Sequence, residues 1–158
     1  MTIKLIITER TSMIHALPLT FLLALSACSE YLPIARGKLE GKVSPLPGQW
    51  SEIATTEIVQ LESTGEAPYS VNLWVAEVGG ALHVFAGDNL AKWVKNIAAN
   101  PDVRLKIGEE IFELRAIRVT DAGVFETFAQ AWASKYGNRP RNENVNETYL
   151  FRLAPRDN

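Results

Sequence analysis

The chain has 158 residues, 47% of them hydrophobic, and a formal net charge of −2, which favours one domain with a single core. No cluster of Lys and Arg is present to neutralise phosphates, so the composition argues against a nucleic-acid partner. A single cysteine excludes an internal disulfide, and the two histidines, His15 and His83, lie too far apart to suggest a metal site.

Residues 1–27 resemble a bacterial lipoprotein signal peptide. The apolar run that follows Lys4 and Arg10 is shorter than the roughly 20 residues of a transmembrane helix. It ends in LSAC, residues 25–28, which resembles a lipobox. The resemblance implies cleavage before Cys28, lipid on that residue, and anchoring in the cell envelope on the periplasmic side, with Ser29 favouring the outer membrane. An ordinary signal peptide or a wrongly assigned start remains an alternative.

Residues 28–52 contain several glycines and prolines and show little periodicity, which predicts a tether or irregular arm in front of a domain at 53–158. In that domain the first predicted strand is 55–62. Residues 69–78 alternate well, so Val71, Leu73 and Val75 face one way and Asn72, Trp74 and Ala76 the other. The pair Gly79–Gly80 predicts a hairpin that returns along 81–87.

A short amphipathic helix follows, with Asp88 as its predicted N-cap and Pro101 as its stop. Four apolar residues at helical spacing form one stripe: Leu90, Trp93, Val94 and Ile97. Three polar residues lie off that stripe: Lys92, Lys95 and Asn96.

Strands are then predicted over 103–108 and 111–119, a second helix over 121–136, and a closing strand over 148–155. The second helix should begin near Asp121, end at Gly137, and bury Phe125, Phe128, Ala129, Trp132 and Tyr136. The polar stretch between this helix and the last strand reads as a loop. The order β-β-β-α-β-β-α-β, with hairpins between strands, predicts a mainly β, α+β fold: a small barrel, because closure removes exposed edges.

Part of the chain resembles a known family. The hairpin VNLWVAEVGGALHVFA and the run from helix to strand are similar to the deazaflavin-dependent nitroreductases, also called F420H2-dependent quinone reductases. The run matches at Trp93, Asn96, Ile97, Ala99, Asn100, Pro101 and Val103. The resemblance implies a split β-barrel of about six mostly antiparallel strands, with a groove on its wall and a homodimer. It also implies F420 or FMN as hydride carrier and a quinone, nitro compound or other small conjugated acceptor as substrate.

Candidate cofactor-binding residues follow from this resemblance. The family's basic turn corresponds here to ESTGEAPYS, in which Thr64 and Gly65 remain and the basic residues are replaced by Glu62 and Glu66. The remaining candidates are Lys92, Trp93, Lys95, Asn96, Asn72 and Trp74. All of these except Asn72 have a structural alternative: a core residue for Trp93, a solvated helix face for the lysines, a helix end for Asn96, and a cover over a barrel end for Trp74.

Three functions remain open from the sequence. The first is an F420- or FMN-dependent oxidoreductase that reduces a quinone or nitro compound near the membrane. The second is a non-catalytic split-barrel binding lipoprotein that has lost its cofactor chemistry, which the altered turn favours; a structural envelope lipoprotein is a third reading. We assign no catalytic residue, and we expect His83 to be exposed or hydrogen-bonded rather than an acid–base group.

Overall fold

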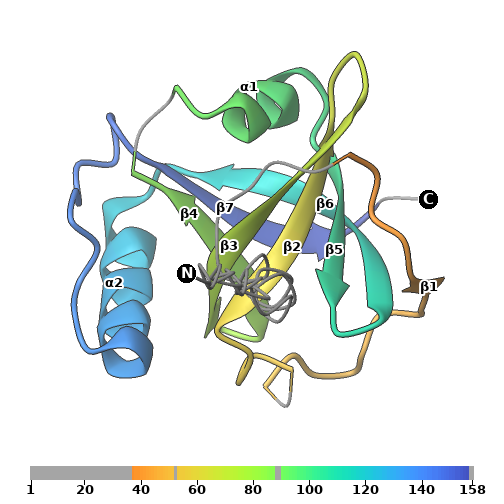
Figure 1. Cartoon of the computed structure of the whole chain (residues 1–158). Coiled ribbons are helices and arrows are strands. Elements are labelled where there is room, and N and C mark those ends of the chain that lie inside the picture. Colours follow the sequence, from red (N-terminus) through yellow and green to blue (C-terminus); the bar gives the residue numbers. More distant parts are fainter. Residues whose placement is uncertain (1–36, 52, 88–89, 157–158) are drawn as a thin grey trace, which may run out of the picture.

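A computed structural model describes residues 37–51, 53–87 and 90–156 (Figure 1). The signal segment, Cys28 and the expected cap Asp88 lie outside the described residues. The lipid anchor therefore stays a prediction, and so does the homodimer. Asp88 is not the cap that was predicted, because Ala91 holds the N-cap position of the first helix. Within the three described ranges, no helix has the length and apolarity needed to cross a membrane.

Six strands form a closed antiparallel barrel in the order β5-β2-β3-β4-β7-β6, which closes through β5 and β6. They are β2 (Ile58–Thr64), β3 (Pro68–Val78), β4 (Ala81–Ala86), β5 (Asp102–Ile107), β6 (Glu110–Val119) and β7 (Tyr149–Pro155). A two-residue strand, β1 (Lys42–Val43), pairs in parallel with β6 outside the barrel. The predicted fold class, a mainly β barrel of about six strands with two helices, is confirmed.

The barrel interior is filled by alternate strand residues, such as Leu61, Val75 and Leu105, that exclude solvent completely. Helix α1 (Lys92–Ala99) covers one end of the barrel and adds three buried side chains, Trp93, Val94 and Ile97 (Figure 1). The prediction was wrong for Leu90, which was expected in this stripe but is 74% exposed. The helix begins only at Lys92, after an Ala91 cap that offers no side-chain acceptor.

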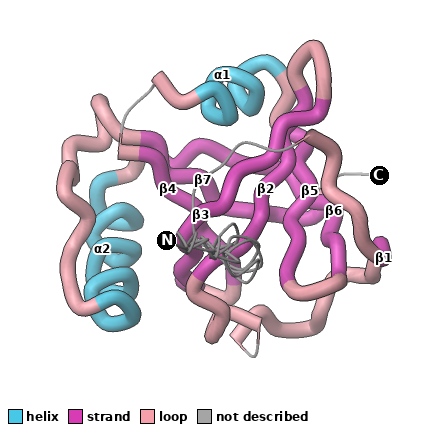
Figure 2. Tube along the Cα trace, viewed as in Figure 1, coloured by secondary structure: helices cyan, strands magenta, loops and turns pink. Residues whose placement is uncertain are grey.

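Helix α2 (Ala122–Tyr136) packs on the outer face of β3 and β4 and forms a second apolar cluster (Figure 1). Its ends confirm the prediction: the Asp121 carboxylate accepts from the Val124 amide at 2.9 Å, and Gly137 closes the helix at φ 79°. Of the predicted buried face, Tyr136 is only half-buried. The loop that follows runs back beside α2 to β7 (Figure 2).

Residues 37–51, the described part of the predicted arm, follow an irregular path across the barrel. Two of their side chains, Leu39 and Trp50, are nevertheless buried. The Trp50 ring meets Phe112 of β6 edge-on at 5.2 Å between centroids. This part of the arm therefore shares the core of the barrel.

Candidate functional site

A groove of about 730 Å³ lies between β3 and the loop that follows α2. Its aromatic walls come from Trp74, Phe85 and Trp132, and its polar groups include Asn72, Arg139 and Arg141. This size and this mixture of apolar walls with a few polar groups are typical of small-molecule sites. We refer to this cavity as the Trp74 groove.

The side chain of Trp74 is unusual among the aromatic residues of the barrel because it is 49% exposed. It stacks on Tyr136 with ring centroids 5.2 Å apart and planes 20° from parallel. Trp132 supports it from the side at 5.5 Å. A large, partly open indole that is held by two neighbours offers a rigid surface on which a flat ring can stack.

The end of α2 fixes the strand segment that carries Trp74. Strand β2 begins at Ile58, opposite Trp74, so the backbone of Val75 lacks a β2 partner. The Tyr136 hydroxyl accepts from the Val75 amide at 3.1 Å and lies 2.8 Å from the carbonyl oxygens of Val75 and Glu57. The Tyr136 side chain of α2 thus bonds the backbone groups of Val75, beyond the point where β2 begins.

Lys135 strengthens the same junction. Its ammonium donates to the carbonyl oxygens of Ala54, Thr56 and Val75 at 2.6, 2.6 and 2.8 Å. Burial lowers the pKa of Lys135 and raises that of Tyr136 to about 12, so the phenol stays protonated at neutral pH. Both groups are committed to the backbone, which identifies them as positioning residues for the Trp74 wall.

Asn72 lies on the same outward face of β3, two residues before Trp74. It is 9% exposed and its amide oxygen accepts from the Gln60 side chain at 3.2 Å. The predicted alternation on this strand therefore holds: Val71 and Val75 fill the barrel, whereas Asn72 and Trp74 line the groove.

The rim of the groove carries two arginines in different electrostatic settings. The Arg139 guanidinium bridges Glu126 of α2 at 2.7 Å and Glu143 of the loop at 2.6 Å. These hydrogen bonds lower the pKa of both carboxyl groups and raise that of Arg139. Within the residues that the structure describes, the exposed Arg141 forms no hydrogen bond or ion pair.

The other predicted residues gather at a different place, between α1 and the β2–β3 turn. The Asn96 amide donates to the Ser63 hydroxyl at 3.1 Å, and a Cβ on Gly65 would lie only 2.6 Å from Asn96 Oδ1. Lys92 lies over the Tyr69 ring at 4.9 Å. Thr64, Lys92 and Lys95 are exposed, and Trp93 is buried against Phe151 of β7.

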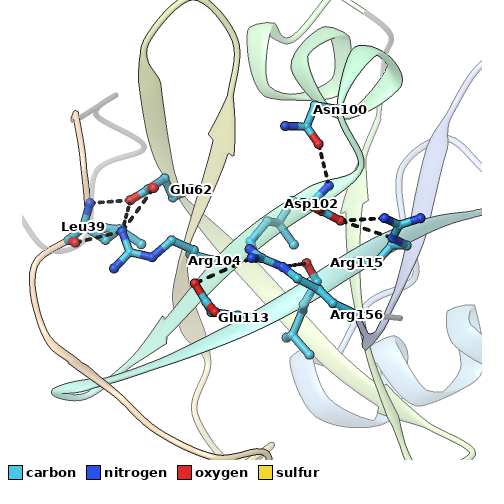
Figure 3. Close-up of polar contacts among 10 residues, drawn as sticks. Leu39, Glu62, Asn100, Asp102, Arg104, Glu113, Arg115 and Arg156 are labelled. Carbon is cyan, nitrogen blue, oxygen red and sulfur yellow. Dashed lines mark hydrogen bonds and ion pairs between the residues drawn. The ribbon is translucent and has the colours of Figure 1, made fainter. Parts of the chain in front are cut away.

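Below that turn, Glu62 does not present its charge to solvent. Its carboxylate accepts from Arg104 at 2.9 Å and from the Leu39 amide at 2.5 Å, while Arg104 also donates to the Leu39 carbonyl at 3.2 Å (Figure 3). The pair therefore holds the N-terminal segment against the barrel. Arg104 is committed to this contact and is no longer available to a ligand phosphate.

A sequence model of the F420H(2)-dependent quinone reductase family matches residues 53–146. The chain belongs to this family. Membership confirms the expected class, an F420-dependent oxidoreductase, and the expectation of F420 or a flavin as cofactor. The match includes β2, β3, β4, α2 and the loop after α2, which together line the Trp74 groove. No curated protein matches the sequence significantly.

Solved structures with the same fold place this family member among split barrels. One described as an F420 reductase has 17% identity and a TM-score of 0.51, with 72% of this chain and 97% of the other covered. A NimC/NimA family protein from Clostridium acetobutylicum has 16% identity and a TM-score of 0.53, over 64% and 76%. A conserved hypothetical protein from Mycobacterium tuberculosis has 15% identity and a TM-score of 0.54, over 76% and 87%. At these identities the likeness establishes the fold alone.

The structure thus divides the predicted residues of this family member into two sets. Asn72 and Trp74 line the groove at the middle of β3, whereas the turn and α1 residues lie at the end of the barrel where that strand begins (Figure 1). Sequence reasoning missed Phe85, Trp132, Arg139 and Arg141. The two arginines lie on either side of Pro140, in a stretch that we predicted only to be a polar loop. Two positive charges so close together could have indicated an anion-binding site.

Proposed function

We propose that the chain is an F420- or FMN-dependent reductase of a small conjugated acceptor, a quinone or nitro compound, and that the Trp74 groove holds the reacting rings. The observation that carries this proposal is the half-exposed Trp74, held by Tyr136 and Trp132 within a cavity large enough for a small ligand. A tryptophan that served only the core would be buried, as Trp93 is.

The residues present fit a flat cofactor with an anionic substituent. Trp74, Phe85 and Trp132 supply apolar surface for a ring, and Asn72 supplies a polar group beside it. Arg141 supplies a positive charge at the rim. Trp74 and Asn72 would therefore hold the ring system, while Tyr136 and Lys135 would keep the strand beneath it in place.

When bound, the reduced cofactor supplies a hydride to the acceptor. Conversion of a quinone to a hydroquinone takes up one hydride and one proton. The aromatic walls would exclude water from a bound ring and hold it in one orientation, so that the acceptor meets it in a defined arrangement. The Tyr136 hydroxyl is bonded to backbone groups, so we give it a positioning role and not that of the proton donor.

The lipobox-like LSAC at residues 25–28 supports a further part of the proposal. Lipid on Cys28 would anchor the domain at the cell envelope on the periplasmic side, in reach of lipophilic quinones. Labelling with a radioactive fatty acid tests this point: the chain should incorporate label, and a Cys28→Ser variant should not.

Titration with FMN and with F420, followed by absorbance and fluorescence, tests the cofactor. We expect Trp74→Ala to weaken binding by about tenfold, because the stacking wall is lost, and Trp74→Phe to retain most of it. Val124→Ala, which removes an exposed apolar side chain outside the groove, is the matched control.

Two outcomes would redirect the proposal. No binding of either cofactor to the wild-type protein at micromolar concentrations would refute it. Binding without reduction of quinones or nitro compounds by the reduced complex would favour the alternative, a non-catalytic binding module, to which the absence of basic residues from the β2–β3 turn also points.

A further inference from the structure

The β2–β3 turn is poorly suited to hold a negatively charged group. No residue from Glu62 to Pro68 is basic, and Glu66 is exposed there. Arg104, a half-buried cation on β5 opposite Glu62, is bound to Glu62 and to the Leu39 backbone (Figure 3). Asn96 occupies the space above Gly65. The turn therefore serves as a packing site for α1.

The Trp74 groove, at the middle of β3, is better suited to an anion. Arg141 lines the Trp74 groove and is exposed, and no described residue neutralises its charge. Its neighbour Arg139 differs, because two carboxylates surround it. A planar guanidinium can donate paired hydrogen bonds to a phosphate or carboxylate, which favours Arg141 as the anion-binding group of the groove.

The backbone on both sides of Arg141 is held in place. The ion pair between Arg139 and Glu143 spans it, and Pro140 is buried. On the other side, the Asn142 side chain accepts from the Asn144 amide at 3.0 Å and donates to Glu147 at 3.1 Å. A fixed loop loses little conformational entropy when its side chain binds a ligand.

The geometry points to Arg141 as the residue that binds the negatively charged group of the ligand in the Trp74 groove. The ligand would thus lie with its ring on Trp74 and its anionic group towards the loop after α2. The charged group is either the phosphate-bearing tail of the cofactor or an acidic substituent of the acceptor. This inference rests on the proposed function, because it assumes that a flat ring occupies the groove.

Matched ligand pairs test the inference. FMN and riboflavin differ only by a phosphate, and F420 can be compared with its chromophore without the phosphate-bearing tail. For an anion on the cofactor, we expect Arg141→Gln to weaken FMN or F420 binding by about fivefold to tenfold and to change binding of the uncharged partner by less than about twofold. Affinity for the charged partner should also fall as salt rises.

A second experiment tests whether the acceptor carries the negative charge. If the anion belongs to the acceptor, Arg141→Gln should raise KM for a carboxylated naphthoquinone and leave KM for the neutral naphthoquinone unchanged. Either result supports the role of Arg141. The experiment in which Arg141→Gln has an effect identifies whether the cofactor or the acceptor carries the charge.

The competing location is α1. A Lys92→Gln/Lys95→Gln double variant removes two exposed cations that do not line the groove. Loss of charged-ligand binding in this variant, with Arg141→Gln unaffected, would overturn the inference. Equal effects of Arg141→Gln on both members of every ligand pair would also overturn it. In both cases the proposed function would survive as long as the wild-type protein still binds riboflavin or the tail-free chromophore. Failure of the wild-type protein to bind any of these ligands would refute the proposed function itself.

Discussion

At the scale of single residues, His83 combines deep burial with an ionisable ring. It is 1% exposed on the face of β4 that packs against α2, with Phe128 at 6.2 Å and Arg152 opposite on β7. Its Nδ1 lies 3.1 Å from the Ala81 carbonyl, and its Nε2 has no partner among the described residues. The expected hydrogen-bonded histidine is found, but in the interior of the protein.

Burial makes His83 a source of acid sensitivity. Desolvation, together with the nearby charge of Arg152, lowers the pKa of His83 below its ordinary 6.5, although the Ala81 carbonyl and Glu77 oppose the shift. The unfolded chain therefore binds the proton more readily. The contribution to stability is fully present above pH 6.5 and is lost as the pH falls below that value.

Urea unfolding between pH 5 and pH 7 measures this effect. We expect the free energy of unfolding of the wild-type protein to fall with decreasing pH, by at most about 1.4 kcal/mol per pH unit for one proton. A His83→Leu variant should show a much flatter profile across the same range. Because His15 is the only other histidine in the sequence, equal slopes for the two proteins would contradict the prediction.

At the scale of elements, α1 is joined to the β2–β3 turn by an interaction that requires glycine at position 65. The Asn96 side chain passes 2.6 Å from the place of a Gly65 Cβ in order to donate to the Ser63 hydroxyl. In Gly65→Ala the amide must move and lose this hydrogen bond, which costs about 1 kcal/mol of stability. Gly48→Ala, with open space around its Cβ, should be nearly neutral.

A double-mutant cycle separates this contact from other effects of the substitution. In an Asn96→Ala background, Gly65→Ala should cost much less than in the wild-type protein, which gives a coupling energy of at least about 0.5 kcal/mol in urea unfolding. Strict additivity of the two changes would show that α1 does not depend on the close approach at Gly65.

The sequence predicted the elements well because their signals are local. The alternation of apolar residues predicted β3. The cap residues Asp121 and Gly137 predicted the two ends of α2, and Pro101 predicted the end of α1. The start of α1 was misplaced because Leu90 continues the apolar spacing although its side chain is mostly exposed. The groove was found only in part, because the approach of Trp132 and the 139–142 loop to β3 depends on how α2 lies across the sheet, which no local pattern encodes.

At the scale of the whole molecule, the N-terminal segment and the barrel are held together by contacts of two kinds. Near its start, the Leu39 backbone is bonded to the Glu62–Arg104 pair (Figure 3). Near its end, Trp50 is 9% exposed and packs edge-on against Phe112. A segment that contributes a tryptophan to the core should unfold together with the barrel.

Replacement of that tryptophan gives the corresponding prediction. Trp50→Ala should lower the free energy of unfolding by about 3 kcal/mol, because it leaves a cavity over Phe112. Trp74→Ala removes the same side chain from a half-exposed position and should cost about 1 kcal/mol or less. Urea unfolding should remain a single transition for the wild-type protein by fluorescence and by circular dichroism. The prediction would be wrong if Trp50→Ala lowered the free energy of unfolding no more than Trp74→Ala does. In that case residues 37–51 would be a tether outside the cooperative unit, which would begin at β2.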